Sequence, residues 1–494
     1  MTLNFRTKSI TVLAYALAMT TFAAPAARAQ DAAAFSAALA LRTDRIVADS
    51  THVAFGWLAQ TAPATFAAKG ALRLKLTLIP WEGEPKSVKE LGTATIFGGD
   101  LAVNPVPFAL DTRGVADGFY RYLAELSDGD ATLAKFEKPV VLAAGLDARQ
   151  AAFAARLEKI SGHESAKASV LYPFDLARVI NLGKRVYGSN NRAPEFGLSQ
   201  AGVQSLYDFS AGLKKSGELL AALEAGKDPV WRAGGERIRH YRMAEADEIL
   251  PYRVFVPSTW DGKSALPLVF ILHGNSRDQD FYFDRDGRII PQTAEKHGMM
   301  LVAPLGYWPN GGYNYVPFNR GRSAGGAAVA TGASQQFGPA RAGAAGFGGV
   351  NGSTTPASLR AEWSEQDAMH VFELIKQEYP IDPKRTFLFG YSAGGQGAHY
   401  FGQKYAGQWV AIAIGGSNAA PGSAYEFERL KGTPMMLFSG AADGVLNATR
   451  TMAQALRDKG VDAVFKEYAG ANHDTAPAAA TPDIFEFFAT HSRK

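Results

Sequence analysis

The feature that most constrains the fold is a series of short apolar runs that begins at about residue 229 and continues to the C-terminus. The run "LPLVFILHG" (Leu266–Gly274) is continuously apolar over its first seven residues, which is typical of a strand buried on both faces of a sheet. Seven further runs have strand character: Glu236–Met243, Leu250–Pro257, Met299–Gly306, Arg385–Ser392, Trp409–Gly416, Thr433–Gly440 and Asp462–Gly470.

Segments with helical character fall between these runs: Glu365–Tyr379, Ala393–Tyr405, Val445–Lys459 and Pro482–His491. Strands that alternate with helices predict that residues 229–494 form an α/β domain, with a mostly parallel sheet of eight strands flanked by helices. Residues 321–356 interrupt this rhythm with a stretch dominated by Gly, Ala and Ser. It is too long for an ordinary loop, and two interpretations stay open, a disordered surface excursion or a mobile lid.

The N-terminal half has a different pattern. In "ALRLKLTLIPW" (Ala71–Trp81), leucines alternate with polar residues, as in a half-buried strand. Several such strands predict a β-sandwich over residues 30–145, and Tyr120 in "DGFYRYLAEL" resembles the corner tyrosine of immunoglobulin-like domains. Residues 146–228 carry good helix formers at helical spacing and predict a helical linker region.

The first 29 residues have the features of a secretory signal peptide. Arg6 and Lys8 precede a short apolar stretch, and Ala27-Arg28-Ala29 supplies a small-x-small cleavage pattern. Cleavage after Ala29 predicts a secreted or periplasmic protein, with an uncleaved membrane anchor as the alternative. It would also remove three of the positive charges behind the net charge of +4, which leaves about +1 and no electrostatic footprint for nucleic acid.

The chain contains no cysteine, which excludes disulfides, a thiolate nucleophile, a cysteine-based zinc site and a lipid-anchoring cysteine. Its nine histidines lack the spacings of metal motifs, so we expect no metal site. No apolar run after the first 29 residues is long enough to span a membrane, so we expect no stable membrane anchor.

A serine is the strongest candidate catalytic residue. Ser392 lies in Gly390-Tyr391-Ser392-Ala393-Gly394, between a predicted buried strand and a predicted helix. Gly-x-Ser-x-Gly in this context lifts the hydroxyl above the carboxyl ends of the strands and makes it a nucleophile. The alternative is a glycine-rich turn whose serine only caps the helix.

The serine needs a base and an orienting acid, which follow later strands in this fold class. Asp443 comes just after "MMLFSG" and His473 just after "FKEYAG", so both are expected at the same edge of the sheet as the serine. Asp462 and Asp474 are rivals for the acid, but neither follows the appropriate strand.

The same edge is expected to supply the oxyanion hole and substrate contacts. The amides of Ala393 and Asn275 are the predicted oxyanion donors, and His273 is expected to brace its loop. The stretch "SEQD", Ser364–Asp367, is expected to cap a helix. Four aromatic residues could stack on an aromatic or sugar-like substrate, or form a structural loop: Tyr307, Trp308, Tyr313 and Tyr315.

With these motifs in place, residues 236–490 resemble α/β-hydrolases of the polyhydroxybutyrate-depolymerase and feruloyl-esterase type, with prolyl-oligopeptidase-like relatives. The resemblance is carried by "LPLVFILHGN", "SEQDAMHVFELIKQEYPIDPKRTFLFGYSAGGQGAHY" and "GANHD". It implies an α/β-hydrolase fold and a secreted serine carboxylic ester hydrolase without cofactor, acting on polymer-linked, aromatic or polyester-type esters through a Ser392–His473–Asp443 triad. Two alternatives remain: a serine peptidase or amidase, and a non-catalytic polymer-binding protein with a vestigial hydrolase domain.

Overall fold

The computed structural model describes residues 39–60, 69–81, 89–101, 105–182, 192–193, 198–199, 209–275, 277–307, 312–314, 357–417 and 426–493. The predicted signal peptide and the Gly/Ala-rich insertion lie outside these ranges, so both stay predictions. Within the described residues, no helix has the length and apolar character needed to cross a membrane.

The C-terminal half is built on an eight-stranded sheet with the order β11-β12-β14-β13-β15-β16-β17-β18. Only β12 runs against the other seven strands, because it pairs antiparallel with both of its neighbours while the remaining pairs are parallel. The strands are β11 Gly235–Met243, β12 Glu248–Val256, β13 Leu266–Leu272, β14 Met300–Pro304, β15 Ile381–Tyr391, β16 Ala411–Gly415, β17 Met435–Gly440 and β18 Ala463–Tyr468.

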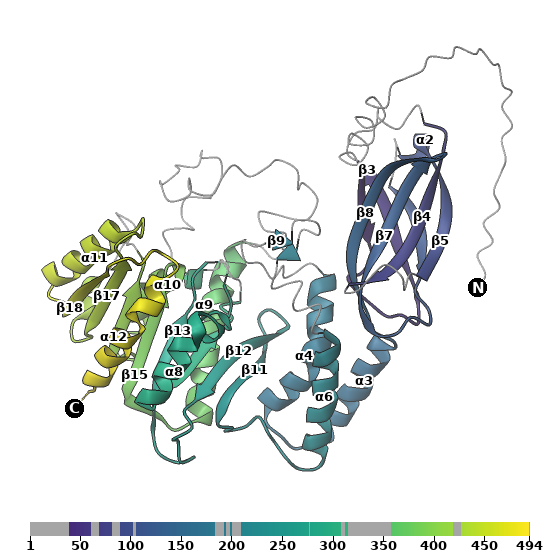
Figure 1. Ribbon diagram of the computed structural model, residues 1–494. Coiled ribbons are helices and arrows are strands. Elements are labelled where there is room, and N and C mark those ends of the chain that lie inside the picture. The colour runs from purple at the N-terminus through teal and green to yellow at the C-terminus, as the bar shows by residue number, and fades with distance from the viewer. Residues whose placement is uncertain are drawn as a thin grey trace, which may run out of the picture.

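Helices cover both faces of this sheet (Figure 1). Alternate residues of one strand enter different cores: Leu268 and Phe270 of β13 pack with helices α9, α10 and α11, whereas Val269 and Ile271 pack with α8 and α12. Burial on both faces explains why β13 has no polar residue. The helical elements are α7 Phe281–Asp284, η2 Asp286–Arg288, α8 Ile289–His297, η3 Gly312–Asn314, α9 Ala357–Glu378, α10 Ala393–Lys404, η5 Phe427–Leu430, α11 Leu446–Asp458 and α12 Ala476–Thr490.

The predicted cap at Ser364–Asp367 is wrong, because helix α9 already begins at Ala357. Ser364 and Asp367 lie inside the helix and are buried. Their side chains bond to the segment that follows β14 rather than to the start of their own helix. Ser-x-x-Asp therefore marks a buried polar contact here, and a four-residue pattern cannot distinguish the two uses.

Two further sheets occupy the N-terminal region and share one apolar core. One has the order β1-β3-β6 and the other β2-β8-β7-β4-β5. Leucines 72, 74, 76 and 78 of β4 face this core, as their alternation predicted. The Tyr120 hydroxyl donates to the Ala116 carbonyl at 3.1 Å, the type of bond that a tyrosine corner makes. The elements are β1 Leu39–Thr43, β2 Val47–Ala48, β3 Val53–Gln60, β4 Ala71–Pro80, β5 Lys89–Phe97, α2 Gly98–Leu101, β6 Val106–Asp111, β7 Gly118–Asp128 and β8 Ala131–Leu142.

Three helices lie between the N-terminal sheets and the large sheet (Figure 1): α3 Leu146–Leu157, α4 Glu164–Asn181 and α6 Phe209–Glu224. Helix α4 contacts both sides. Its last residue, Asn181, accepts bonds from the amides of Ile46 and Val47 at 2.9 and 3.0 Å, while Asp175 accepts from the Ile249 amide of β12 at 2.6 Å. Two short strands, β9 Arg192–Ala193 and β10 Leu198–Ser199, pair with each other between α4 and α6.

Candidate active site

The turn between β15 and α10 holds Ser392 in a strained conformation. Its φ and ψ are 58° and −120°, which a residue with a side chain rarely adopts. The glycines on either side are required by close backbone contacts. A Cβ at Gly390 would lie 2.1 Å from the Gly394 oxygen, and a Cβ at Gly394 would lie 2.0 Å from the Leu272 oxygen. The glycines therefore allow the strand, turn and helix to pack at the spacing that exposes the serine.

Three side chains from separate loops meet at this turn. His473 follows β18, and its Nε2 lies 3.1 Å from the Ser392 Oγ. Its Nδ1 lies 2.8 Å from the Asp443 Oδ2, and Asp443 follows β17. Because β15, β17 and β18 run parallel, their carboxyl ends share one edge of the sheet, which brings these distant residues together. Nucleophile, base and acid thus form one continuous line of contacts.

Asp443 is held in its ionised form although its side chain is only 2% exposed. Burial opposes ionisation, but the contact with His473 and the Val445 amide bond at 3.0 Å outweigh it, and the pKa of Asp443 is lowered. The Tyr391 hydroxyl adds a further bond to Oδ2 at 3.2 Å. An ionised carboxylate beside Nδ1 fixes the ring orientation that a general base needs.

The rival acids have other environments. Asp462 is exposed at the opposite end of β18, and its carbonyl pairs with the Met435 amide. Asp474 is also exposed, and its carbonyl accepts a bond from Arg285. Of the three aspartates, Asp443 is the one whose carboxylate contacts His473.

The loop after β13 lies directly against the nucleophile. A Cβ at Gly274 would lie 3.3 Å from the Ser392 Cβ, so the backbone passes beside the serine as an oxyanion loop does. Asn275 follows and is exposed, and Ala393 is the first residue of α10. The donor roles of these two amides stay predictions.

His273 braces this loop, as expected from the sequence. Its ring is buried, with Nδ1 2.9 Å from the Gly274 oxygen and Nε2 2.7 Å from the Leu305 oxygen. Burial lowers the pKa of His273, and the two carbonyl contacts partly oppose this. The histidine thereby ties the end of β13 to the segment after β14.

Two of the four predicted substrate-binding aromatics are core residues. Tyr307 and Tyr313 are 0% and 2% exposed. The Tyr307 hydroxyl donates to Glu248 at 3.0 Å, and the Tyr313 oxygen accepts a bond from the His273 amide at 3.0 Å. Their burial corrects the expectation that these rings stack on a substrate. Trp308 and Tyr315 lie outside the described residues.

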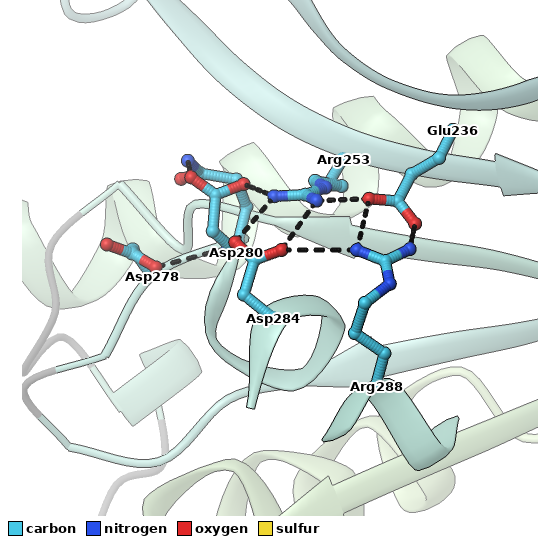
Figure 2. A network of polar contacts seen from close by, with 7 residues as sticks. Glu236, Arg253, Asp278, Asp280, Asp284 and Arg288 are labelled. Carbon is cyan, nitrogen blue, oxygen red and sulfur yellow. Dashed lines mark hydrogen bonds and ion pairs between the residues drawn. The ribbon is translucent and has the colours of Figure 1, made fainter. Parts of the chain in front are cut away.

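A charged network that the sequence analysis missed surrounds Arg253 and holds residues 280 and 284, which follow the loop after β13 (Figure 2). Arg253 of β12 donates to Asp280 at 2.7 Å and to Asp284 at 2.8 and 3.0 Å, and it also pairs with Glu236. Arg288 completes the network by pairing with Glu236. The signal available in the sequence was Arg253, a lone cation in an otherwise apolar part of β12.

Burial raises the pKa of Asp280 to about 6, and the nearby Asp278 carboxylate adds to this rise, against the opposing effect of Arg253. Burial likewise raises the pKa of Asp278. In the described part of the chain, no group of three or more His, Asp or Glu side chains is arranged to hold a metal ion.

Comparisons with protein-family models and with curated proteins found no match. Among solved structures, a thermostable esterase is 19% identical, with a TM-score of 0.37 over 52% of this chain and 63% of that chain. The fluorophosphonate-binding serine hydrolase F of Staphylococcus aureus is 15% identical, with a TM-score of 0.36 over 52% of this chain and 99% of that chain. A ferulic acid esterase of Anaeromyces mucronatus is 16% identical, with a TM-score of 0.37 over 52% and 90%. Values this low assign no activity to the chain, so the case for a function rests on the geometry of the site.

Proposed function

We propose that the chain is a serine esterase of the α/β-hydrolase fold that cleaves carboxylic esters through an acyl-enzyme on Ser392. One observation carries the proposal: an unbroken line of contacts runs from Asp443 through His473 to a serine on a strained strand-to-helix turn. A serine that only capped a helix would need neither this strain nor a buried carboxylate behind the histidine.

The arrangement supports a two-step reaction. As Ser392 Oγ attacks the ester carbonyl carbon, His473 Nε2 takes the hydroxyl proton. The carbon–oxygen bond to the alcohol then breaks, and Nε2 returns the proton to the leaving oxygen. Water repeats the sequence on the acyl-enzyme and releases the acid and the free serine. Asp443 stays ionised throughout and stabilises the imidazolium.

The tetrahedral intermediates carry a negative oxygen that needs fixed donors. We assign this role to the amides of Ala393 and Asn275. Ala393 begins helix α10, where the partial positive charge of the helix N-terminus also favours an anion. Asn275 follows the glycine that lies against the serine.

For the substrate we propose a class of esters and not a single compound. The resemblance of the sequence to polyhydroxybutyrate depolymerases and feruloyl esterases favours polymer-linked, aromatic or polyester-type esters, hydrolysed outside the cytoplasm and without a cofactor. The N-terminal sheets would then serve as a spacer, a polymer-binding module or a partial cover of the site. Peptide and amide bonds are the alternative substrates, because the same triad cleaves both.

The test combines substitution and labelling. Ser392→Ala should abolish p-nitrophenyl acetate hydrolysis and labelling by a fluorophosphonate probe, while the circular dichroism spectrum stays that of the parent. His473→Gln should lose the activity as well. His370→Gln is the matched control, since His370 is a half-exposed histidine on α9 that pairs with Glu245. Undiminished activity in Ser392→Ala, or no labelling of the parent protein, would refute the proposal. Chromogenic esters assayed beside aminoacyl anilides separate an esterase from a peptidase.

A further inference from the structure

Three of the described residues that follow β14 are held in a strained conformation. Tyr307, Tyr313 and Asn314 have φ angles of 49°, 53° and 61°, the left-handed region that side chains disfavour. Strain of this kind persists only where the surrounding structure holds it, and it concentrates at functional sites. The contacts that hold these three residues, and the elements that these residues contact in turn, therefore bear on the site.

Helix α9 holds these residues through three side chains of about one helical turn. The Tyr307 amide donates to Asp367 Oδ2 at 2.7 Å, and the Tyr313 amide donates to Ser364 Oγ at 3.1 Å. The Asn314 side chain donates to Glu365 Oε2 at 2.8 Å. The two backbone-amide bonds are buried, and leaving a buried amide unpaired is costly. The strained backbone is thus fixed to a 22-residue helix of the main core.

Tyr313 connects this fixed segment to the two elements that carry the proposed chemistry. Its oxygen accepts the bond from the His273 amide, at the start of the oxyanion loop. Its ring lies against Gly397 of α10, where a Cβ would come within 2.7 Å of the ring. The next residue of the loop, Gly274, lies against Ser392. One buried tyrosine therefore sets the distance between the oxyanion loop and the helix behind the nucleophile.

We propose that Tyr313 is a positioning residue, which acts by holding the His273–Asn275 backbone where the oxyanion forms. The inference rests on the proposed esterase function and adds to it. The ring does not touch the substrate, because it is buried. Its hydroxyl oxygen stabilises the loop before substrate arrives, so the benefit appears in the transition state, where the oxyanion develops. A displacement of about 1 Å at such a site lowers the rate about 100-fold.

Tyr313→Phe in the full chain tests this, because it removes the acceptor and keeps the ring. We expect kcat for p-nitrophenyl acetate to fall about 10- to 100-fold, with KM within about twofold. Inhibition by a trifluoromethyl ketone, which forms an oxyanion on the serine, should weaken by a similar factor.

The matched control is Tyr241→Phe. Tyr241 lies on β11 and is also buried, and its hydroxyl donates to Asp367 of the same helix at 2.7 Å. This variant should lower the thermal midpoint while keeping kcat and the inhibitor affinity of the parent. A kcat unchanged in Tyr313→Phe, or lowered equally in both variants, would overturn the positioning role.

Two further measurements keep the inference testable. If Tyr313→Phe does not fold, Ser364→Ala replaces it, because it removes the acceptor of the Tyr313 amide; kcat should fall with KM retained, and an unchanged kcat overturns the inference. Fluorophosphonate labelling of the parent protein distinguishes a failure of the proposed esterase function from a failure of the positioning role. An unlabelled parent refutes the esterase itself, whereas a labelled parent with a fully active Tyr313→Phe refutes only the positioning role.

Discussion

Replacing Asp443 by Asn probes the triad with almost no change in shape. Asp443 Oδ1 accepts a bond from the Val445 amide at 3.0 Å, and Oδ2 faces His473 Nδ1 at 2.8 Å. The Val445 N–H requires an acceptor, so the asparagine oxygen should take the Oδ1 position. The amide NH2 group then faces Nδ1 and donates to it.

This substitution selects the wrong tautomer of His473. A ring that accepts at Nδ1 carries its proton on Nε2, and Nε2 can no longer accept the proton of Ser392 across their 3.1 Å contact. The same change in a serine protease triad lowers kcat about 10⁴-fold, which corresponds to about 5.5 kcal/mol of transition-state stabilisation. We expect a loss of about 10³- to 10⁴-fold here.

The assay is kcat/KM for p-nitrophenyl acetate, together with the rate of phosphonylation by a fluorophosphonate, since both depend on the same base. The control is Asp462→Asn, an exposed aspartate at the opposite end of β18 that should leave both rates unchanged. A loss of less than about tenfold in Asp443→Asn would show that His473 does not depend on this carboxylate, and the reasoning would fail.

Three stability predictions follow from buried contacts. Gly394→Ala places a methyl group 2.0 Å from a backbone oxygen of β13, so it should prevent folding or strongly lower the thermal midpoint. Gly444→Ala is the control and should keep the thermal midpoint of the parent, because its methyl group meets nothing within 4 Å. Equal midpoints in the two variants would contradict this prediction. Because burial raises the pKa of Asp280 to about 6, this residue's contribution to the free energy of unfolding is fully present below about pH 4 and is lost as the pH rises to about 6, by up to about 3 kcal/mol. Asp280→Asn should remove that part of the pH dependence in urea titrations at pH 4 and pH 7, and an unaltered difference between the two would count against the assignment. Arg239→Met should lower the free energy of unfolding by about 3–5 kcal/mol, since it leaves the buried Glu378 without its cation. Adding Glu378→Gln should restore part of the loss. If Arg239→Met is as stable as the parent, the pair does not contribute this energy.

The sequence was sufficient for features that depend on local pattern. The apolar run of β13 predicted burial on both faces, and the leucine alternation of β4 predicted a single buried face. The turn at Ser392 was also predictable, because Gly-x-Ser-x-Gly is a local pattern, although Gly394 is required by a contact with the more distant strand β13. Parallel strands share one carboxyl edge, so the residues that follow β17 and β18 could be placed beside the serine by topology alone.

Other features depend on which segments pack together, and the sequence contains no local sign of them. The sequence left open whether Tyr307 and Tyr313 stack on a substrate or form a structural loop, and helix α9, encoded some 50 to 60 residues later, bonds to both of these buried residues. Ser364 and Asp367 fit a capping pattern, but helix α9 begins at Ala357. The same residue types serve a cap, a core bond or a substrate contact.

The sequence by itself predicted the eight strands of the large sheet and the identity of the three candidate catalytic residues. Only the tertiary structure decided the partners of the buried polar groups, including the tyrosine that accepts a bond from the His273 amide and the arginine that donates to Asp280. The physical reason is the distance along the chain over which each effect acts. Periodicity and turn chemistry act over a few residues, whereas a buried hydrogen bond needs its donor and acceptor to meet from anywhere in the chain.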